Sequence, residues 1–148
     1  MAEIAVGKEA PDFTLKDESN QEVRLSDLRG APVVLVFYVA DFSGVCSNEM
    51  CAYRDDYSAF EAKGARVFGI SRDTIFAHKA FKESLGLQFP LLADPKGDVA
   101  RLYGAWIEAL ALAERLTVVI DRDGIIRYVT RSEIPKARDH REALAALG

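Results

Sequence analysis

The chain has 148 residues, of which 49% are hydrophobic and 28% are charged, the proportions of an ordinary soluble globular domain. We therefore expect one domain over residues 1–148, large enough to bury a core without disulfides or a structural metal. The net charge of −4 argues against nucleic acid as a partner, because phosphate binding needs a concentrated basic surface. The longest local basic cluster is interrupted by acids and is interpreted as a solvated face: Arg127, Arg131, Lys136 and Arg138.

The sequence predicts neither a membrane span nor a secretory leader. Its longest apolar run, 31–40, is far shorter than the ~20 residues that a membrane helix requires. The first ten residues contain acids and lack the apolar core of a signal peptide. We therefore expect a cytoplasmic protein with no membrane partner. Thiols stay reduced in that compartment, so its two cysteines are more readily explained by catalysis or metal binding than by a structural disulfide.

The first half of the chain predicts, in order, strands at 12–15 and 21–25, a buried strand at 32–39, a loop at 40–45 and a helix at 46–63. The first two strands flank turn residues and form a hairpin. The third is a continuous Val-rich run, which is typical of a strand buried on both faces of a sheet. Apolar residues at helical spacing indicate the helix, and Gly64 ends it.

The second half predicts a strand at 66–71, a helix at 74–85, an extended piece at 89–93, a short helix at 98–103, strands at 116–121 and 125–130, and a closing helix at 137–147. Asp73 is expected to cap the helix at 74–85, and Gly86 to end it. Asp123 and Gly124 predict a tight hairpin turn. Strands that alternate with helices indicate an α/β sandwich, and the closing hairpin makes its sheet mixed.

Cys46 begins the predicted helix at 46–63, shortly after a buried strand. Open α/β sheets place their sites at such a position. Unpaired backbone N–H groups and the helix dipole favour negative charge there, which lowers the pKa of a thiol and populates the nucleophilic thiolate. Ser43, three residues earlier, could cap the helix or bind a substrate oxygen, and the residues alone leave both possibilities open.

Cys51 follows Cys46 by five residues. In an ideal helix that spacing is ~140° around the axis and ~7.5 Å along it, with Cα atoms about 8.6 Å apart. Because a disulfide needs Cα atoms within ~7 Å, the two cysteines could bond only if the first turns unwind. The alternative is that either cysteine is a small buried hydrophobe. The spacing fits neither a zinc site nor the C-x-x-C of thioredoxins.

At these residues the chain resembles the peroxiredoxins, whose signature after a buried strand is Pro-x-x-x-Thr/Ser-x-x-Cys. Residues 37–46 read F-Y-V-A-D-F-S-G-V-C, with Val39 where the family has proline. The following C-S-N-E-M-C is similar to the Cys-x-x-Glu-x-Cys of the bacterioferritin-comigratory, or Q-type, group. The resemblance continues in order through 10–15, 69–71, 89–95 and 115–121. Valine leaves φ unlocked and restores a backbone N–H, so proline does not shape this loop.

The resemblance implies a thioredoxin-like three-layer sandwich, with a central mixed sheet flanked by helices. It implies a thiol peroxidase that reduces hydrogen peroxide and organic hydroperoxides without a cofactor or metal. Cys46 would become a sulfenic acid, and Cys51 would resolve it as a disulfide that a thioredoxin-like dithiol reduces. Arg115 would hold the thiolate, while Ser43 and the Cys46 N–H bind the peroxide. Glu49 would orient Arg115 or cap the helix, and the chain would be a monomer or homodimer.

Three alternatives stay open. A general thiol–disulfide oxidoreductase would share the fold, although the missing C-x-x-C speaks against it. A binding or chaperone-like protein with a decayed pocket is favoured only by Val39. A peroxidase resolved by an external thiol would leave Cys51 without a role. Asp41 would oppose thiolate formation unless it points to solvent or pairs with a base, and His78 is interpreted as a packing or surface residue.

Overall fold

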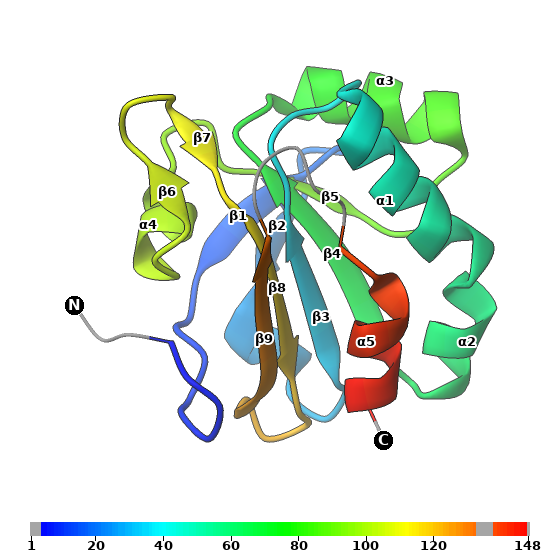
Figure 1. Cartoon of the computed structure of the whole chain (residues 1–148), viewed down its shortest axis with the longest axis vertical. Coiled ribbons are helices and arrows are strands. Elements are labelled where there is room, and N and C mark those ends of the chain that lie inside the picture. The colour runs from blue at the N-terminus through cyan, green and yellow to red at the C-terminus, as the bar shows by residue number, and fades with distance from the viewer. Residues whose placement is uncertain (1–3, 133–137, 148) are drawn as a thin grey trace.

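The computed structural model describes residues 4–132 and 138–147, and for Cys46 it describes the backbone alone. A mixed sheet forms the middle of the described molecule, in the order β2-β1-β5-β4-β3-β8-β9 (Figure 1). Its strands are β1 (Thr14–Asp17), β2 (Glu22–Arg24), β3 (Val33–Phe37), β4 (Arg66–Ser71), β5 (Leu91–Ala93), β8 (Arg115–Ile120) and β9 (Ile126–Ser132). Central β3 pairs parallel with β4 and antiparallel with β8.

Two further layers cover the sheet (Figure 1). One face is packed by α1 (Gly44–Asp55), α2 (Tyr57–Ala62), α3 (Ile75–Leu85) and α5 (His140–Ala146). The other face is packed by the N-terminal segment, the 3-10 helix η1 (Leu25–Leu28), α4 (Asp98–Leu102) and the small β6 (Trp106–Ile107) and β7 (Leu112–Ala113) sheet. This arrangement confirms the predicted three-layer sandwich. In the described part, no helix is long and apolar enough to cross a membrane.

Strand β3 shows why its sequence is apolar throughout. Val33, Leu35 and Phe37 point into the core beneath α4, while Val34 and Val36 point into the core beneath the larger helices. A strand covered on both faces replaces the usual alternation of apolar and polar residues with a continuous apolar run. The carboxyl end of β3, from which the chain runs to Cys46, is therefore anchored on both sides.

The helix predicted at 46–63 begins earlier than expected and is broken. It starts at Gly44 and ends at Asp55, and α2 follows after Asp56. Asp56 has φ −103° and ψ 15°, and its carboxylate lies 2.6 Å from His140 Nε2 of α5. The apolar spacing continues through the break, so the periodicity did not reveal it.

Two other details differ from the prediction. Thr74, not Asp73, caps α3, since its Oγ1 accepts the Ala77 N–H at 3.2 Å. The closing helix begins at His140 after the cap Asp139, whose carboxylate accepts the Arg141 N–H. Its predicted start, residue 137, lies outside the described residues. The short elements η1, β6 and β7 were not predicted because they hold too few residues to show a period.

Candidate active site

The loop from β3 to α1 presents the first cysteine. Cys46 lies in the first turn of α1, where the Ser47 N–H donates to the Ser43 carbonyl at 2.7 Å. Ser43 occupies the N-cap position with φ −71° and ψ 137°, yet its side chain makes no capping hydrogen bond. The capping interpretation of Ser43 is therefore wrong. Its role in binding a substrate oxygen stays a prediction.

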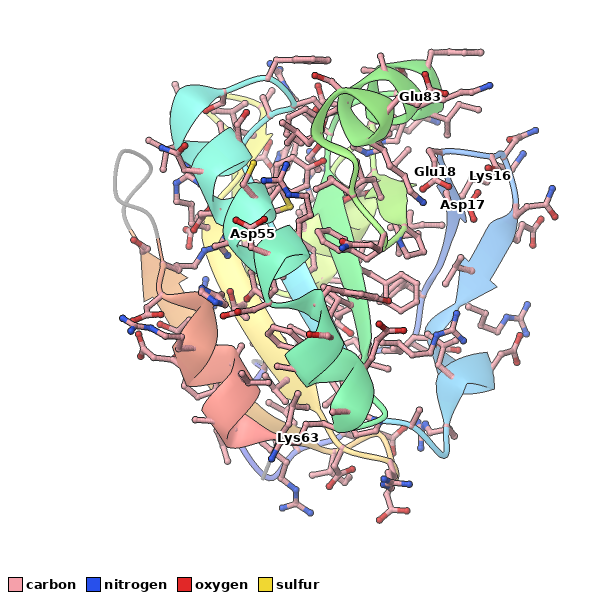
Figure 2. All side chains as sticks on the ribbon, turned by 90° about the vertical axis from the view of Figure 1, so that its right-hand side faces the viewer. Lys16, Asp17, Glu18, Asp55, Lys63 and Glu83 are labelled. Atoms are coloured by element: carbon pink, nitrogen blue, oxygen red, sulfur yellow. The ribbon has the colours of Figure 1, made fainter. Side chains whose placement is uncertain are left out.

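Cys51 lies in the same continuous helix as Cys46 and is a free, partly buried cysteine. Its neighbour Met50 is completely buried against the sheet, and Tyr53 is almost completely buried. Figure 2 shows α1 across this side of the sheet, with the exposed Asp55 near its end. Because α1 is intact from Gly44 to Asp55, the spacing argument applies, and a Cys46–Cys51 disulfide requires the helix to unwind.

Arg115 and Glu49 meet beneath α1. Arg115 opens β8, and the alternation of that strand turns Arg115 and Thr117 to the side of the larger helices. Arg115 Nη1 donates to Glu49 Oε1 at 2.5 Å, with side chains only 1% and 2% exposed. The structure therefore brings together two of the predicted residues, Glu49 and Arg115. Glu49 lies three positions after Cys46. Two roles were expected for Glu49, orienting Arg115 or capping the helix. The observed hydrogen bond to Arg115 agrees with the first.

Arg138 completes this cluster and was missed in the sequence. Its backbone N–H and Nε donate to Glu49 Oε2 at 2.7 and 2.8 Å, and its Nη2 donates to Oε1 at 3.0 Å. Its Nη1 also donates to Thr117 Oγ1 at 3.1 Å. The solvated-face interpretation is wrong for Arg138, whose side chain is 5% exposed. Its acidic neighbour Asp139 made it look like a surface residue.

The other members of the basic cluster behave differently from Arg138. Arg127 and Arg131 are exposed and pair with Asp121 and Glu114. Lys136 lies outside the described residues. Tertiary contacts with Glu49 and Thr117 separate Arg138 from these side chains, and no local pattern in the sequence indicates such contacts.

Two guanidinium groups surround a single carboxylate in the Glu49 cluster, so these three side chains together carry one positive charge. Buried guanidinium groups favour a nearby anion. A thiolate at the start of α1, or the anion that leaves during cleavage of a peroxide, matches this demand. A buried guanidinium group stabilises an anion more strongly than one that faces solvent.

A second buried polar cluster holds the loop before α1. Tyr38 Oη donates to Asp41 Oδ1 at 2.5 Å, and His78 Nδ1 lies 2.7 Å from Asp41 Oδ2. Burial and the charge of Asp41 raise the pKa of Tyr38 well above its ordinary value, so the phenol stays protonated. Asp41 therefore pairs with a base, the condition under which it does not oppose a thiolate. His78 is completely buried, which excludes the surface interpretation.

Three residues of this region have ligand atoms within 4.8 Å of one another, as a metal site would require: Asp41, Asp73 and His78. Their oxygen and nitrogen atoms already make hydrogen bonds. Asp41 Oδ2 contacts His78, and Asp73 Oδ2 accepts the Asp41 N–H at 2.8 Å and the Ser71 hydroxyl at 2.5 Å. These hydrogen bonds explain why the oxygen and nitrogen atoms of Asp41, Asp73 and His78 lie close together.

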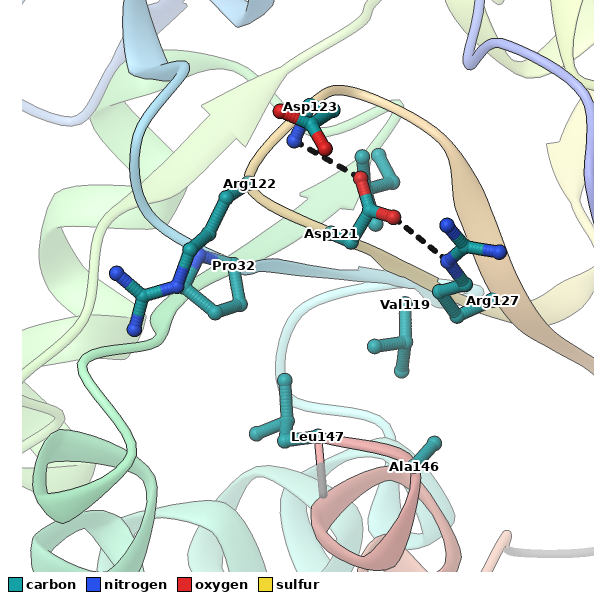
Figure 3. A pocket seen from close by; sticks show the side chains of 9 residues that line it. Pro32, Val119, Asp121, Arg122, Asp123, Arg127, Ala146 and Leu147 are labelled. Carbon is teal, nitrogen blue, oxygen red and sulfur yellow. Dashed lines mark hydrogen bonds and ion pairs between the residues drawn. The ribbon is translucent and has the colours of Figure 1, made fainter.

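A pocket of about 230 Å³ lies at the opposite end of β3, between the β8–β9 turn and the end of α5 (Figure 3). Pro32, Val119 and Leu147 give it apolar walls, and Asp121 pairs with Arg127 on its rim at 2.6 Å. None of the predicted catalytic residues lines this pocket. The residues predicted to be catalytic lie at the other end of β3, where α1 and β8 begin.

Comparison with known proteins relates the whole chain to one group of enzymes. The model of the AhpC/TSA family matches residues 6–129. Alkyl hydroperoxide reductase E of Mycobacterium tuberculosis is 41% identical over 97% of this chain and 98% of its own length. Chloroplastic peroxiredoxin Q of Suaeda salsa is 38% identical over 99% of this chain and 69% of its own length. The crystal structure of peroxidoxin BcpB from M. tuberculosis superposes with a TM-score of 0.89 at 34% identity, covering 97% of this chain and 96% of that one.

Proposed function

This chain belongs to the AhpC/TSA family and is a thiol-dependent peroxidase, and we propose that Cys46 is its peroxidatic nucleophile and Cys51 its resolving cysteine. The observation that carries the proposal is the buried cluster attached to α1, in which the guanidinium groups of Arg115 and Arg138 both contact the Glu49 carboxylate. Glu49 lies three residues after Cys46, so the cluster and the thiol share the first turns of one helix. A buried positive charge at this position favours the thiolate over the thiol.

In the first step the Cys46 thiolate attacks the distal oxygen of a hydroperoxide. The sulfur–oxygen bond forms as the oxygen–oxygen bond breaks, and the departing oxygen takes a proton and leaves as water or an alcohol. Cys46 is oxidised to a sulfenic acid. We assign the Ser43 hydroxyl and the Cys46 N–H to the peroxide oxygens, and Arg115 to the developing charge.

In the second step Cys51 attacks the sulfenic sulfur and expels water, which leaves a Cys46–Cys51 disulfide. The first turns of α1 must unwind for the sulfur atoms to meet. Such unwinding disturbs two contacts between the cysteines: the buried Met50 side chain and the Glu49 ion pairs. A dithiol reductant then reduces the disulfide by exchange and regenerates both thiols.

Several finer features are part of the same proposal. The substrates are hydrogen peroxide and organic hydroperoxides, and the name of the mycobacterial relative, an alkyl hydroperoxide reductase, supports the second class. A thioredoxin-like protein is the proposed reductant. A monomeric or homodimeric state and a cytoplasmic location stay predictions, since relatives named chloroplastic occur among the similar proteins.

The test is a single turnover. Fully reduced protein receives one equivalent of hydrogen peroxide, and intact mass and free thiols are recorded over seconds. We expect both thiols to disappear and the mass to fall by two hydrogens. In the Cys51→Ser variant the expected product is Cys46 with one added oxygen, and in Cys46→Ser no fast reaction is expected.

Three other outcomes would redirect the proposal. A fast gain of oxygen with Cys51 still free in the wild-type protein would mean that an external thiol resolves Cys46. A reaction no faster than that of a small free thiol would overturn the peroxidatic assignment of Cys46. Rapid exchange with protein disulfides alongside slow peroxide reduction would favour a general oxidoreductase.

A further inference from the structure

We propose that Asp41 and His78, together with Tyr38, are positioning residues that hold the peroxide-binding loop in the place of the family's proline. The inference rests on the proposed role of Cys46 and goes beyond it, since none of the three side chains is assigned to the reacting atoms. It also explains how a chain with Val39 at the proline position keeps a defined loop between β3 and α1.

The loop between β3 and α1 contains a residue in a strained conformation. Phe42, next to Asp41, has φ 64°, a left-handed value that a bulky side chain rarely adopts. Phe42 is 59% exposed, and its one ring–ring contact in the described part is with Phe81 of α3, with ring centroids 5.1 Å apart. A strained residue persists only where its surroundings hold it. A half-exposed ring contributes little of that restraint, so the neighbouring residue must contribute more.

Asp41 is restrained from three different elements. Tyr38 at the end of β3 donates to its Oδ1, and His78 of α3 lies against its Oδ2. The Asp41 backbone N–H donates to Asp73 of the β4–α3 turn, which Ser71 fixes in turn. Side chain and backbone of Asp41 are thus both held. Proline would restrict this segment through φ of one residue, whereas here hydrogen bonds to separate elements restrict it.

The hydrogen bonds also define the charge of the pair. His78 Nε2 lies 3.0 Å from the Leu92 carbonyl, which can only accept, so Nε2 carries a hydrogen. His78 Nδ1 and Asp41 Oδ2 are 2.7 Å apart, and one proton must lie between them for the contact to be favourable. Imidazolium with carboxylate and imidazole with carboxylic acid both satisfy this, and both leave the pair without net charge.

The neutrality of the pair matters for the nucleophile on the adjoining helix. The other ionisable groups that face His78 are Tyr38, which burial keeps protonated, and the Asp73 carboxylate. Without a partner, Asp41 would add a buried negative charge five residues before Cys46 and would lose the restraint on Oδ2. Removing His78 therefore disturbs both the position and the charge of the loop that leads to Ser43.

Variants of His78 separate this role from general packing. Asparagine places its amide nitrogen near the position of Nδ1 and can still donate to Asp41. Glutamine places it nearer Nε2, and phenylalanine provides no donor. For each variant we would measure the rate of Cys46 with hydrogen peroxide and, separately, with iodoacetamide, which needs the thiolate but not the peroxide-binding loop. A displacement of ~1 Å in such a loop can cost ~10²-fold in rate.

We expect His78→Phe to lower the peroxide rate ~10- to 100-fold. The iodoacetamide rate should fall less, because it reports only the thiolate that the unpaired Asp41 charge disfavours and not the position of the loop. His78→Asn should recover most of the peroxide rate, and His78→Gln should not. Tyr38→Phe, which removes one hydroxyl, is the variant to use should His78→Phe fail to fold, and it should lower the peroxide rate in the same selective way. Unchanged ratios of the two rates in the folded variants would overturn the inference.

The chain provides a matched control. His140 and Asp56 form a second histidine–aspartate pair, with Nε2 and Oδ2 2.6 Å apart, at the junction of α1 and α2. His140→Phe, which removes the donor to Asp56, should lower the melting temperature without changing the ratio of the peroxide and iodoacetamide rates. A slow wild-type protein would mean that the proposed function fails. A fast wild-type protein with an equally fast His78→Phe variant would mean that only the positioning role fails.

Discussion

The carboxylate of Glu49 accepts a hydrogen bond from Arg115 at 2.5 Å, and both side chains are almost completely removed from solvent. Burying such a pair costs desolvation free energy that its attraction offsets only in part. A pair of this kind is therefore weak evidence for stability. Its attachment to the helix of Cys46, and the second guanidinium of Arg138, fit the proposal that Cys46 reacts as a thiolate.

Glu49→Gln keeps the shape of the side chain and removes its charge. Two buried guanidinium groups then lose the Glu49 carboxylate as a counter-ion, so we expect the free energy of unfolding to fall by about 3–5 kcal/mol. The peroxide rate should fall as well, because one of the two oxygens that orient Arg115 and Arg138 becomes an amide NH2, which cannot accept a hydrogen bond. Urea unfolding and single-turnover kinetics measure the two effects.

The matched control for Glu49→Gln is Glu114→Gln. Glu114 pairs with Arg131 at 2.9 Å on the surface, with both side chains more than a third exposed. Surface pairs contribute about 0–1 kcal/mol, so little change is expected. Equal losses in the two variants would contradict the special position of Glu49.

Met50→Ala tests the unwinding of α1. Met50 is completely buried between the two cysteines in sequence, so its truncation should lower the free energy of unfolding by about 2–5 kcal/mol. Because unwinding also removes this contact, the variant should form the Cys46–Cys51 disulfide faster once the sulfenic acid is present. Intact mass against time resolves the two steps. The exposed Asn48→Ala on the same helix should leave the second step unchanged, and a slower second step in Met50→Ala would argue against unwinding.

Val39→Pro restores the residue that the family signature carries. If the Asp41 network already holds the loop, this substitution should change the peroxide rate less than about threefold in the wild-type background, an effect below ~0.7 kcal/mol. In the Tyr38→Phe background it should recover much of the lost rate, since contacting restraints are not additive. Stopped-flow rates of the two single variants and the double variant measure the coupling. Simple additivity would mean that proline and the network act independently.

Asp139 gives a prediction for acidic pH. The Arg141 side chain lowers the pKa of the Asp139 carboxyl from 3.8 to about 2. A carboxyl with a depressed pKa in the folded state stabilises that state above pH 3.8, and the contribution is lost as the pH falls toward 2. Arg141→Gln should return the pKa toward its ordinary value, as an NMR titration of the carboxyl carbon would show. An unchanged titration midpoint would show that Arg141 is not the cause.

Local patterns in the sequence predicted much of the fold. The continuous apolar run at 32–39, the glycines that end helices and the Asp123-Gly124 turn each act within a few residues, so β3, α3 and the β8–β9 hairpin were predicted near their observed places. Helical spacing likewise placed both cysteines on one helix. The roles of Ser43 and Arg115 came from family resemblance, because their side chains have no distinguishing local pattern.

The contacts that organise the candidate site join residues far apart along the chain. Arg138 and Glu49 are 89 positions apart, and His78 and Asp41 are 37 apart. The break at Asp56 coincides with a contact to His140, 84 positions away. A charged or polar side chain looks the same in sequence whether it faces water or a buried partner. Which of them becomes buried depends on how the sheet and its covering helices pack, and folding alone brings these partners together.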